Sequence, residues 1–218
     1  MSKGLLLWDI DGTLVKRRNS NRTSIHLEAL NMPPMPNESA TELTGLTDWE
    51  VLKHYSTDLK SVETSFIKLD ELQENESHYE FQRIKGIDDS IFNNLKEKWN
   101  HGILTGNSFR RATFKLEAVG LKKHFSENHF YVCRQNETRL NIAERMIKHL
   151  DNAYEYIVLI GDTKNDIKTA KEIALPIIAV ATGKYDFLTL AELNPTLAIK
   201  DLESDLIIFQ DFLNSMAM

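Results

Sequence analysis

Short apolar runs recur along the chain, and segments with helical periodicity separate them. The runs cover residues 5–8, 102–104, 129–132, 157–160 and 177–180, and residues 197–199 can form a sixth. Between them apolar residues are spaced by three and four, as in Phe109, Ala112, Leu116 and Val119. Buried strands that alternate with helices form a parallel sheet covered on both faces. The pattern therefore predicts a doubly wound, Rossmann-like α/β core with a mostly parallel sheet.

The segment 16–85 interrupts this alternation. It is polar, and it shows helix-like stretches at 24–30, 48–55 and 62–72 but no run of the buried-strand type. A chain of 218 residues is long for one domain and short for two. We expect a core of residues 1–15 and 86–218, with a helical segment, 16–85, inserted between the first and second core strands. Thr47 and Asp48 either cap the helix that contains Trp49 or lie over a functional site of the core.

Composition narrows the class of partner. The chain is 42% hydrophobic and 27% charged, as is usual for a soluble globular protein, and its net charge is -6. That charge argues against nucleic acid or an anionic membrane as the main partner, whereas a small anionic substrate remains compatible with it. The single cysteine, Cys133, suits a reducing cytoplasm, and the first apolar run is too short for a signal peptide or a membrane span.

Two carboxylates mark the end of the first predicted strand. Asp9 and Asp11 lie two residues apart, and Gly12 permits a sharp turn beside them. One carboxylate can attack phosphorus to give an aspartyl phosphate, and the other can protonate the leaving oxygen and later activate water. The alternative is a strand end with solvated acids in a turn.

Polar groups follow two further strands. Thr105 and Gly106, in HGILTGN, can bind phosphate oxygens at a helix N-terminus, or the segment can be an ordinary helix cap. Asp162 ends the strand 157–160, and Asp166 follows four residues later. Asp9 and Asp162 can share one hard divalent cation, for which magnesium is suited. The carboxyl ends of parallel strands meet in one crevice, so these groups are expected to converge.

These motifs together resemble those of the haloacid dehalogenase-like hydrolase superfamily, in its phosphatase branch. WDIDGT is similar to the first motif of the superfamily, ILTGN to the second and GDTKND to the fourth. The segments that surround these motifs in the superfamily also have counterparts here: KLEAVGLKKHF, AVATG and LTGLTDWEVL. The resemblance implies a Rossmann-like core with a type 1 helical cap, as in phosphoglycolate phosphatase-like members.

The resemblance also implies roles for individual residues. Asp9 would be the nucleophile and a metal ligand, and Asp11 the general acid and base, with its backbone carbonyl on the metal. Thr105 and Gly106 would hold the phosphate. Asp162 would be a Mg²⁺ ligand, and Asp166 would support the metal shell. The substrate would be a small phosphorylated metabolite.

The third motif departs from the family pattern, because Arg134 and Arg139 stand where the family commonly has a lysine. A cation there would neutralise Asp9 and the phosphate. We predict that Arg134 has this role, since it directly follows the predicted strand 129–132. Arg139 is the alternative. A third possibility is that either arginine is only a solvated side chain at the start of a helix.

Three functions fit these residues. The first is hydrolysis of a small phosphomonoester through an aspartyl phosphate. A sugar-phosphate mutase or phosphotransferase would use the same chemistry. A non-catalytic binding protein on the same fold is the third, and the presence of every motif acid disfavours it.

Overall fold

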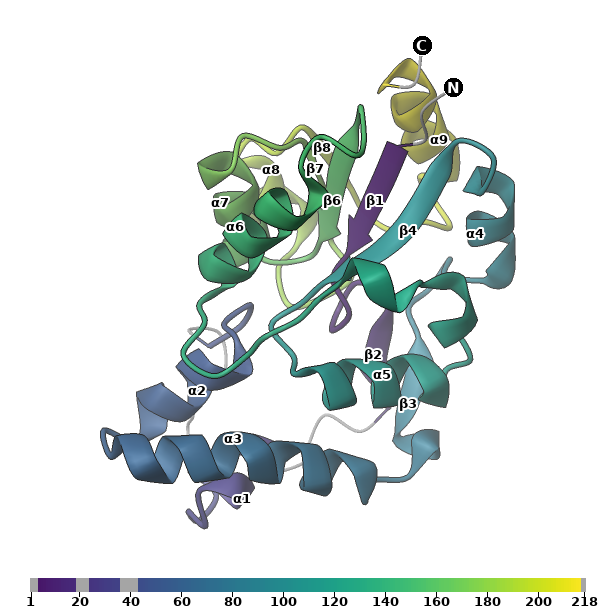
Figure 1. Cartoon of the computed structure of the whole chain (residues 1–218). Helices are drawn as coiled ribbons and strands as arrows, with labels where there is room; N and C mark the ends of the chain where they lie inside the picture. Colours follow the sequence, from purple (N-terminus) through teal and green to yellow (C-terminus); the bar gives the residue numbers. More distant parts are fainter. Residues whose placement is uncertain (1–3, 19–23, 36–42, 217–218) are drawn as a thin grey trace.

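The computed structural model describes residues 4–18, 24–35 and 43–216 and has the predicted α/β architecture (Figure 1). Its main sheet has the strand order β5-β4-β1-β6-β7-β8, with all neighbours parallel. The strands are β1 (Gly4–Trp8), β4 (Trp99–Leu104), β5 (Phe130–Tyr131), β6 (Ile157–Gly161), β7 (Ile177–Val180) and β8 (Leu197–Ile199). The predicted fold class is confirmed.

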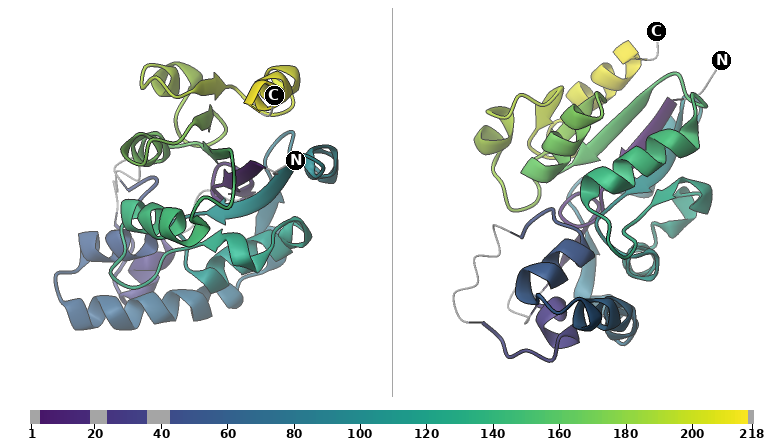
Figure 2. Two further views of the ribbon diagram at one scale, coloured as in Figure 1. Left: turned by 45° about the horizontal axis from the view of Figure 1, so that its top comes forward. Right: turned by 60° about the vertical axis from the view of Figure 1, so that its left-hand side comes forward.

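Alternate residues of β1 pack against two different helical layers. Leu6 and Trp8 pack in a cluster with α4 (Asp89–Leu95), α5 (Phe109–Ala118) and α9 (Leu206–Met216). Leu5 and Leu7 pack in a second cluster with α6 (Arg139–Leu150), α7 (Lys164–Glu172) and α8 (Phe187–Ala191). Figure 2 shows the helices on both sides of the sheet. Successive strand residues point to opposite faces, so a sheet covered twice requires the continuous apolar runs of the sequence.

Within its described residues, the insert contains three helices and a two-stranded stem. The helices are α1 (Ile25–Ala29), α2 (Asp48–Tyr55) and α3 (Leu59–Glu74), and they lie at the end of the molecule opposite α9 (Figure 1). In the stem, β2 (Val15–Arg17) pairs antiparallel with β3 (Phe81–Arg83). These strands lie at the two expected joints of the insert, and they are too short and polar to leave an apolar run in the sequence. Residues 19–23 and 36–42 of the expected insert lie outside the described residues.

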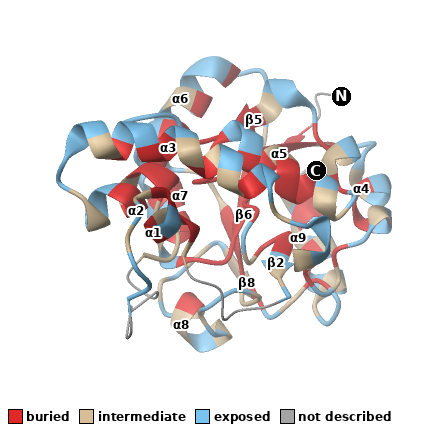
Figure 3. Ribbon diagram, turned by 90° about the horizontal axis from the view of Figure 1, so that it is seen from below, coloured by how far each residue is buried: buried red, intermediate tan, exposed pale blue. Residues whose placement is uncertain are grey.

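Short connecting elements complete the chain. They are the 3₁₀ turns η1 (His78–Glu80), η2 (Lys122–His124) and η3 (Glu127–His129). Figure 3 shows buried residues along the strands and exposed ones on the outer turns of the helices. No helix within the described ranges combines the length and the apolar character that a membrane crossing requires.

The register of the central strands positions the site. Trp8, the last residue of β1, lies opposite Ile103 of β4 on one side and Ile160 of β6 on the other. Residues that follow these three strands therefore meet at one edge of the sheet, facing the insert.

Candidate active site

A cavity of about 220 Å³ opens at this edge of the sheet. Asp9, which directly follows β1, lines it together with Asp11, and Thr105 and Gly106, which follow β4, line another part. The insert contributes further lining residues: His26, Leu43, Thr44, Gly45, Leu46, Asp48 and Val51. The remaining lining residues are Asn107, Arg111, Arg139 and Thr163. The structure thus brings the groups predicted from the first two motifs to one cavity between core and insert.

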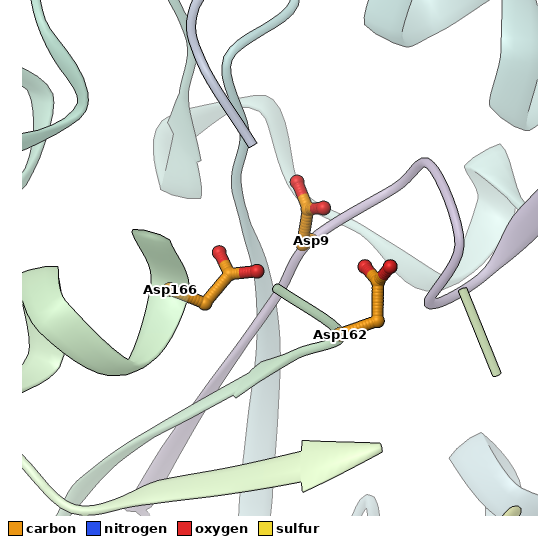
Figure 4. A group of neighbouring side chains, drawn as sticks. All are labelled: Asp9, Asp162 and Asp166. Atoms are coloured by element: carbon orange, nitrogen blue, oxygen red, sulfur yellow. The ribbon is translucent and has the colours of Figure 1, made fainter. Parts of the chain in front are cut away.

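Three aspartates gather beside this cavity. Asp9, Asp162 and Asp166 are all buried, and each offers a carboxylate oxygen within 4.8 Å of the others (Figure 4). Burial raises the pKa of Asp9 to about 6, although Arg139 opposes the shift. Burial, and then the charge of Asp9, raises the pKa of Asp162 well above its usual range. Crowded carboxylate oxygens with too little positive charge nearby fit a hard divalent cation such as Mg²⁺.

Gly12 allows the loop after β1 to pass close to Asp162. Its φ is +82°, and a Cβ on this residue would lie 2.3 Å from Oδ2 of Asp162. Any other side chain would therefore be strained and would displace the carboxylate. The next residue uses the close approach, because the Thr13 hydroxyl donates a hydrogen bond of 3.0 Å to Oδ1 of Asp162.

Asp166 belongs both to the capping box of α7 and to the acidic group. Thr163 is the N-cap of α7, and its backbone N–H and hydroxyl donate to Oδ2 of Asp166 at 2.9 and 2.6 Å. The other oxygen, Oδ1, is ion-paired with Arg139. The helix start therefore fixes this carboxylate beside the other two acids.

Arg139 is the cation that contacts the acidic group. Its guanidinium is buried, and Nη2 lies 3.1 Å from Oδ1 of Asp9 and 3.3 Å from the carbonyl oxygen of Leu104. Arg139 is the first residue of α6, where side chains point back toward the helix N-terminus and so toward the strand ends.

Arg134, the residue predicted for this position, lies elsewhere. Its side chain is exposed and is not among the residues that line the cavity. The strand β5 ends at Tyr131, and the loop after it carries Arg134 outward. In that loop the Arg134 backbone N–H donates to Oε2 of Glu137 at 3.0 Å. The expected placement of Arg134 level with Asp9 is therefore not observed.

A buried lysine, Lys115 of α5, was not predicted from the sequence. Its Nζ lies 2.5 Å from Oδ2 of Asp11 and 2.7 Å from Oδ1 of Asn107. Burial raises the pKa of Asp11, but Lys115 and then Asn107 outweigh it and lower that pKa below its usual value. The only sequence signal for this residue is its place in KLEAVGLKKHF, next to the predicted core residue Leu116.

Thr47 and Asp48 satisfy both interpretations left open by the sequence. Thr47 caps α2, accepting a hydrogen bond from the Glu50 backbone N–H at 3.1 Å, and its hydroxyl donates to the carbonyl oxygen of Glu137 at 2.8 Å. The Asp48 backbone N–H donates to the carbonyl oxygen of Gly106 at 2.8 Å, beside the cavity. The start of α2 is thus the point where the insert contacts the loop after β4.

Fold and site together define a class of protein: a doubly wound α/β protein with a carboxylate site at the carboxyl edge of its sheet. The sequence profile of the haloacid dehalogenase-like hydrolase family matches residues 6–180. The chain belongs to this family, as its motifs predicted.

Solved structures share the fold over nearly the whole chain. A predicted phosphatase from Clostridium acetobutylicum has a TM-score of 0.73 at 14% identity, covering 98% of this chain and 99% of the other. A haloacid dehalogenase-like hydrolase from Streptococcus pneumoniae has a TM-score of 0.70 at 19% identity, covering 95% and 98%. A predicted phosphoglycolate phosphatase from Haemophilus somnus has a TM-score of 0.70 at 16% identity, covering 96% and 99%. No functionally curated protein matches the chain.

Proposed function

We propose that the chain is a magnesium-dependent phosphatase that hydrolyses a small phosphomonoester through an aspartyl phosphate on Asp9. The observation that carries this proposal is the joint placement of Asp9 and Asp11. Both carboxylates line one cavity, and Arg139 lies against the first of them. Membership of a hydrolase family and the phosphatases among the similar structures support it.

In the first half of the proposed reaction, a carboxylate oxygen of Asp9 attacks phosphorus. The new O–P bond forms while the bond from phosphorus to the leaving oxygen breaks, and protonated Asp11 gives its proton to that oxygen. Thr105 and the backbone amides near Gly106 hold the phosphate oxygens. Arg139 stabilises the negative charge that gathers around phosphorus.

In the second half, Asp11 is a base. It takes a proton from a water molecule as the water oxygen attacks the aspartyl phosphate, and the bond to Asp9 breaks. Inorganic phosphate leaves, Asp9 is a carboxylate again, and Asp11 is protonated for the next turnover. Asp9 has to stay ionised, which Arg139 favours. Asp11 has to gain and lose a proton in each turnover, against the lowering of its pKa by Lys115.

Asp9, Asp162 and the backbone carbonyl of Asp11 would hold Mg²⁺, with Asp166 supporting them. When bound, the ion supplies positive charge that lowers the repulsion between a phosphate dianion and the aspartates.

The size of the cavity favours a small substrate. About 220 Å³ is less than the volume of sites for drug-sized ligands, so the leaving group would be a short metabolite skeleton. The residues of the insert that line the cavity would contact that leaving group. We include a cytoplasmic location in the proposal, which the free and buried Cys133 favours. A mutase or phosphotransferase would return an isomerised or transferred phosphate rather than inorganic phosphate, so product analysis distinguishes these reactions.

The test is the release of inorganic phosphate from p-nitrophenyl phosphate with Mg²⁺, followed by a screen of phosphorylated metabolites. Asp9→Asn should lower turnover by about 1,000-fold or more, because the amide has nearly the same shape but cannot attack phosphorus. The matched control is Asp211→Asn, which changes an exposed aspartate of α9 in the same way and should leave turnover unaltered. A folded Asp9→Asn protein with wild-type turnover would exclude the proposed mechanism.

A further inference from the structure

Lys115 is a buried cation of α5, one helical turn after the buried Arg111. Its side chain is only 4% exposed, and its neighbours Ala112 and Leu116 on α5 are fully buried in the core. Burying an ammonium group is unfavourable before any pairing, and an apolar residue at such a position is often at least as stabilising. Core packing by itself therefore gives no reason for a lysine at position 115, whereas its contacts suggest one.

The contacts of Lys115 form a closed triangle around one oxygen of Asp11. Nζ of Lys115 donates to Oδ2 of Asp11 at 2.5 Å and to Oδ1 of Asn107 at 2.7 Å. The Asn107 amide nitrogen donates to the same Oδ2 at 2.7 Å and to the Thr105 hydroxyl at 2.9 Å. Because Lys115 occupies the amide oxygen, the Asn107 side chain is fixed with its N–H groups toward Asp11 and Thr105.

These bonds use one oxygen of Asp11 and not the other. Both donors end on Oδ2, and neither uses Oδ1. The Asp11 side chain is 53% exposed and lines the cavity, while Lys115 lies behind it. A carboxylate held by two charge-assisted or amide donors on one oxygen keeps a single rotamer and presents the second oxygen in a fixed direction.

We infer that Lys115 is a positioning residue: together with Asn107 it donates hydrogen bonds to Oδ2 of Asp11, so that Oδ1 is held where the substrate's leaving oxygen lies. This inference rests on the proposed function, in which Asp11 gives its proton to that oxygen. It extends the site to a residue of α5 that touches neither the phosphate nor the nucleophile. It also gives Asn107 a second task, since the amide links the Asp11 carboxylate to the phosphate-binding Thr105.

The test uses two probes of nearly equal size whose leaving groups differ in their need for a proton. Phenyl phosphate releases a basic phenolate that requires protonation, whereas p-nitrophenyl phosphate releases a weakly basic one. The quantity to compare is kcat/KM, because it reports the steps up to departure of the phenol and not the later attack of water. Lys115→Met should lower kcat/KM for phenyl phosphate by about tenfold or more, a part of the usual contribution of a general acid. For p-nitrophenyl phosphate the loss should stay below about threefold.

Two further variants complete the design. Lys115→Arg keeps a donor to Oδ2 and should recover part of the phenyl phosphate activity. Lys123→Met is the matched control, since this lysine is exposed and pairs with Asp89 on the surface; it should leave both probes unaltered. Far-ultraviolet circular dichroism and the unfolding midpoint show that the variants are folded, and methionine suits a buried helix position.

Equal losses on both probes would overturn the inference, because they would mean that Lys115 acts only through its charge on the phosphate or through the fold. Unchanged rates on both would overturn it as well. The proposed function is judged separately by Asp9→Asn: if that variant keeps its activity on p-nitrophenyl phosphate, the phosphatase mechanism fails regardless of the result for Lys115.

Discussion

Arg139 supplies the positive charge beside Asp9, the proposed nucleophile. It lies 3.1 Å from Asp9, is buried, and also pairs with Asp166, whereas Arg134 is exposed on the preceding loop. A preorganised charge at the reacting phosphate typically contributes 100- to 1,000-fold in turnover. We predict that Arg139→Ala lowers kcat by about 100-fold or more and that Arg134→Ala lowers it by less than about tenfold. Steady-state kinetics with p-nitrophenyl phosphate and Mg²⁺ provides the measurement.

Arg134→Ala is also the matched control, because it removes the same kind of side chain from the loop between β5 and α6. Arg139→Lys should retain more activity than Arg139→Ala, although a single ammonium cannot span Asp9 and Asp166 as the guanidinium does. Equal kcat values for wild type and a folded Arg139→Ala protein would show that the buried ion pair has only a structural role.

Strand-end residues could be located from the sequence, and long side chains could not. Asp9, Thr105 and Asp162 directly follow apolar runs, and the register of a parallel sheet places such residues at one edge. The position of a guanidinium or an ammonium depends instead on where a helix begins and how a loop approaches it. Arg139 reaches the site because α6 begins at this residue, beside the strand ends. Lys115 reaches Asp11 because its side chain extends from α5 into the site. Neither fact is encoded in the spacing of the residues.

At the scale of elements, one buried ion pair joins α2 of the insert to α5 of the core. Asp48 pairs with the Arg111 guanidinium, accepts a hydrogen bond from the Ser108 backbone N–H at 3.0 Å, and lies 3.0 Å from Nε2 of His26. Burial alone would raise the pKa of Asp48, but Arg111 and His26 hold it well below the usual range. The carboxylate is therefore ionised in the folded protein at neutral pH.

We predict a strong energetic coupling in this pair. Asp48→Asn and Arg111→Met should each lower the free energy of unfolding by about 3 kcal/mol or more, because each leaves a buried charge or donor unpaired. In a double-mutant cycle measured by urea unfolding, the coupling energy should be about 1 to 3 kcal/mol.

The control cycle uses Arg110 and Glu74, which also join α5 to the insert but are 53% and 42% exposed. Their coupling should stay below about 1 kcal/mol, as is usual for exposed pairs. Additive effects of the Asp48 and Arg111 changes would mean that the insert is held in place by its apolar contacts alone.

Elements with a strong pattern could be predicted, and short ones could not. The apolar runs locate the six strands of the main sheet, and the three- and four-residue spacing locates α5, α6 and α7. The stem strands β2 and β3 have only three residues each. In each strand a single apolar residue is followed by two polar ones. They form because they pair with each other, a long-range contact that neither segment reveals alone.

For the whole molecule, the insert and the core share one apolar cluster. Trp49 and Phe66 of the insert belong to the same cluster as Leu104 and Tyr131 of the core. The interruption of the strand–helix alternation indicates an insert, but it gives no information about this shared packing. The division into residues 16–85 and a core therefore stays a prediction, and the two parts are expected to unfold together.

The acidic group makes the stability of the whole molecule depend on pH, and we expect it to make stability depend on Mg²⁺ as well. Folding raises the pKa of Asp9 from its ordinary value, 3.8, to about 6, chiefly by burial. Between these two values the folded state holds more protons than the unfolded state, so the stability conferred by protonated Asp9 is lost as the pH rises through 6. Asp162, whose pKa is also raised, acts in the same direction.

We therefore predict that, without Mg²⁺, the aspartate group contributes a fall in unfolding free energy from pH 4 to pH 7, and that Mg²⁺ opposes this fall. An ion that binds only the folded state stabilises it by about 2.7 kcal/mol at one hundred times its dissociation constant. The gain should be large at pH 7 and small at pH 4, where protons compete for the same oxygens.

Thermal unfolding with Mg²⁺ or with a chelator measures this gain in stability at both pH values. Asp162→Ala should remove most of the gain at pH 7, whereas Asp211→Ala, an exposed change on α9, should keep it. A gain that persists undiminished in Asp162→Ala would place the cation elsewhere on the molecule.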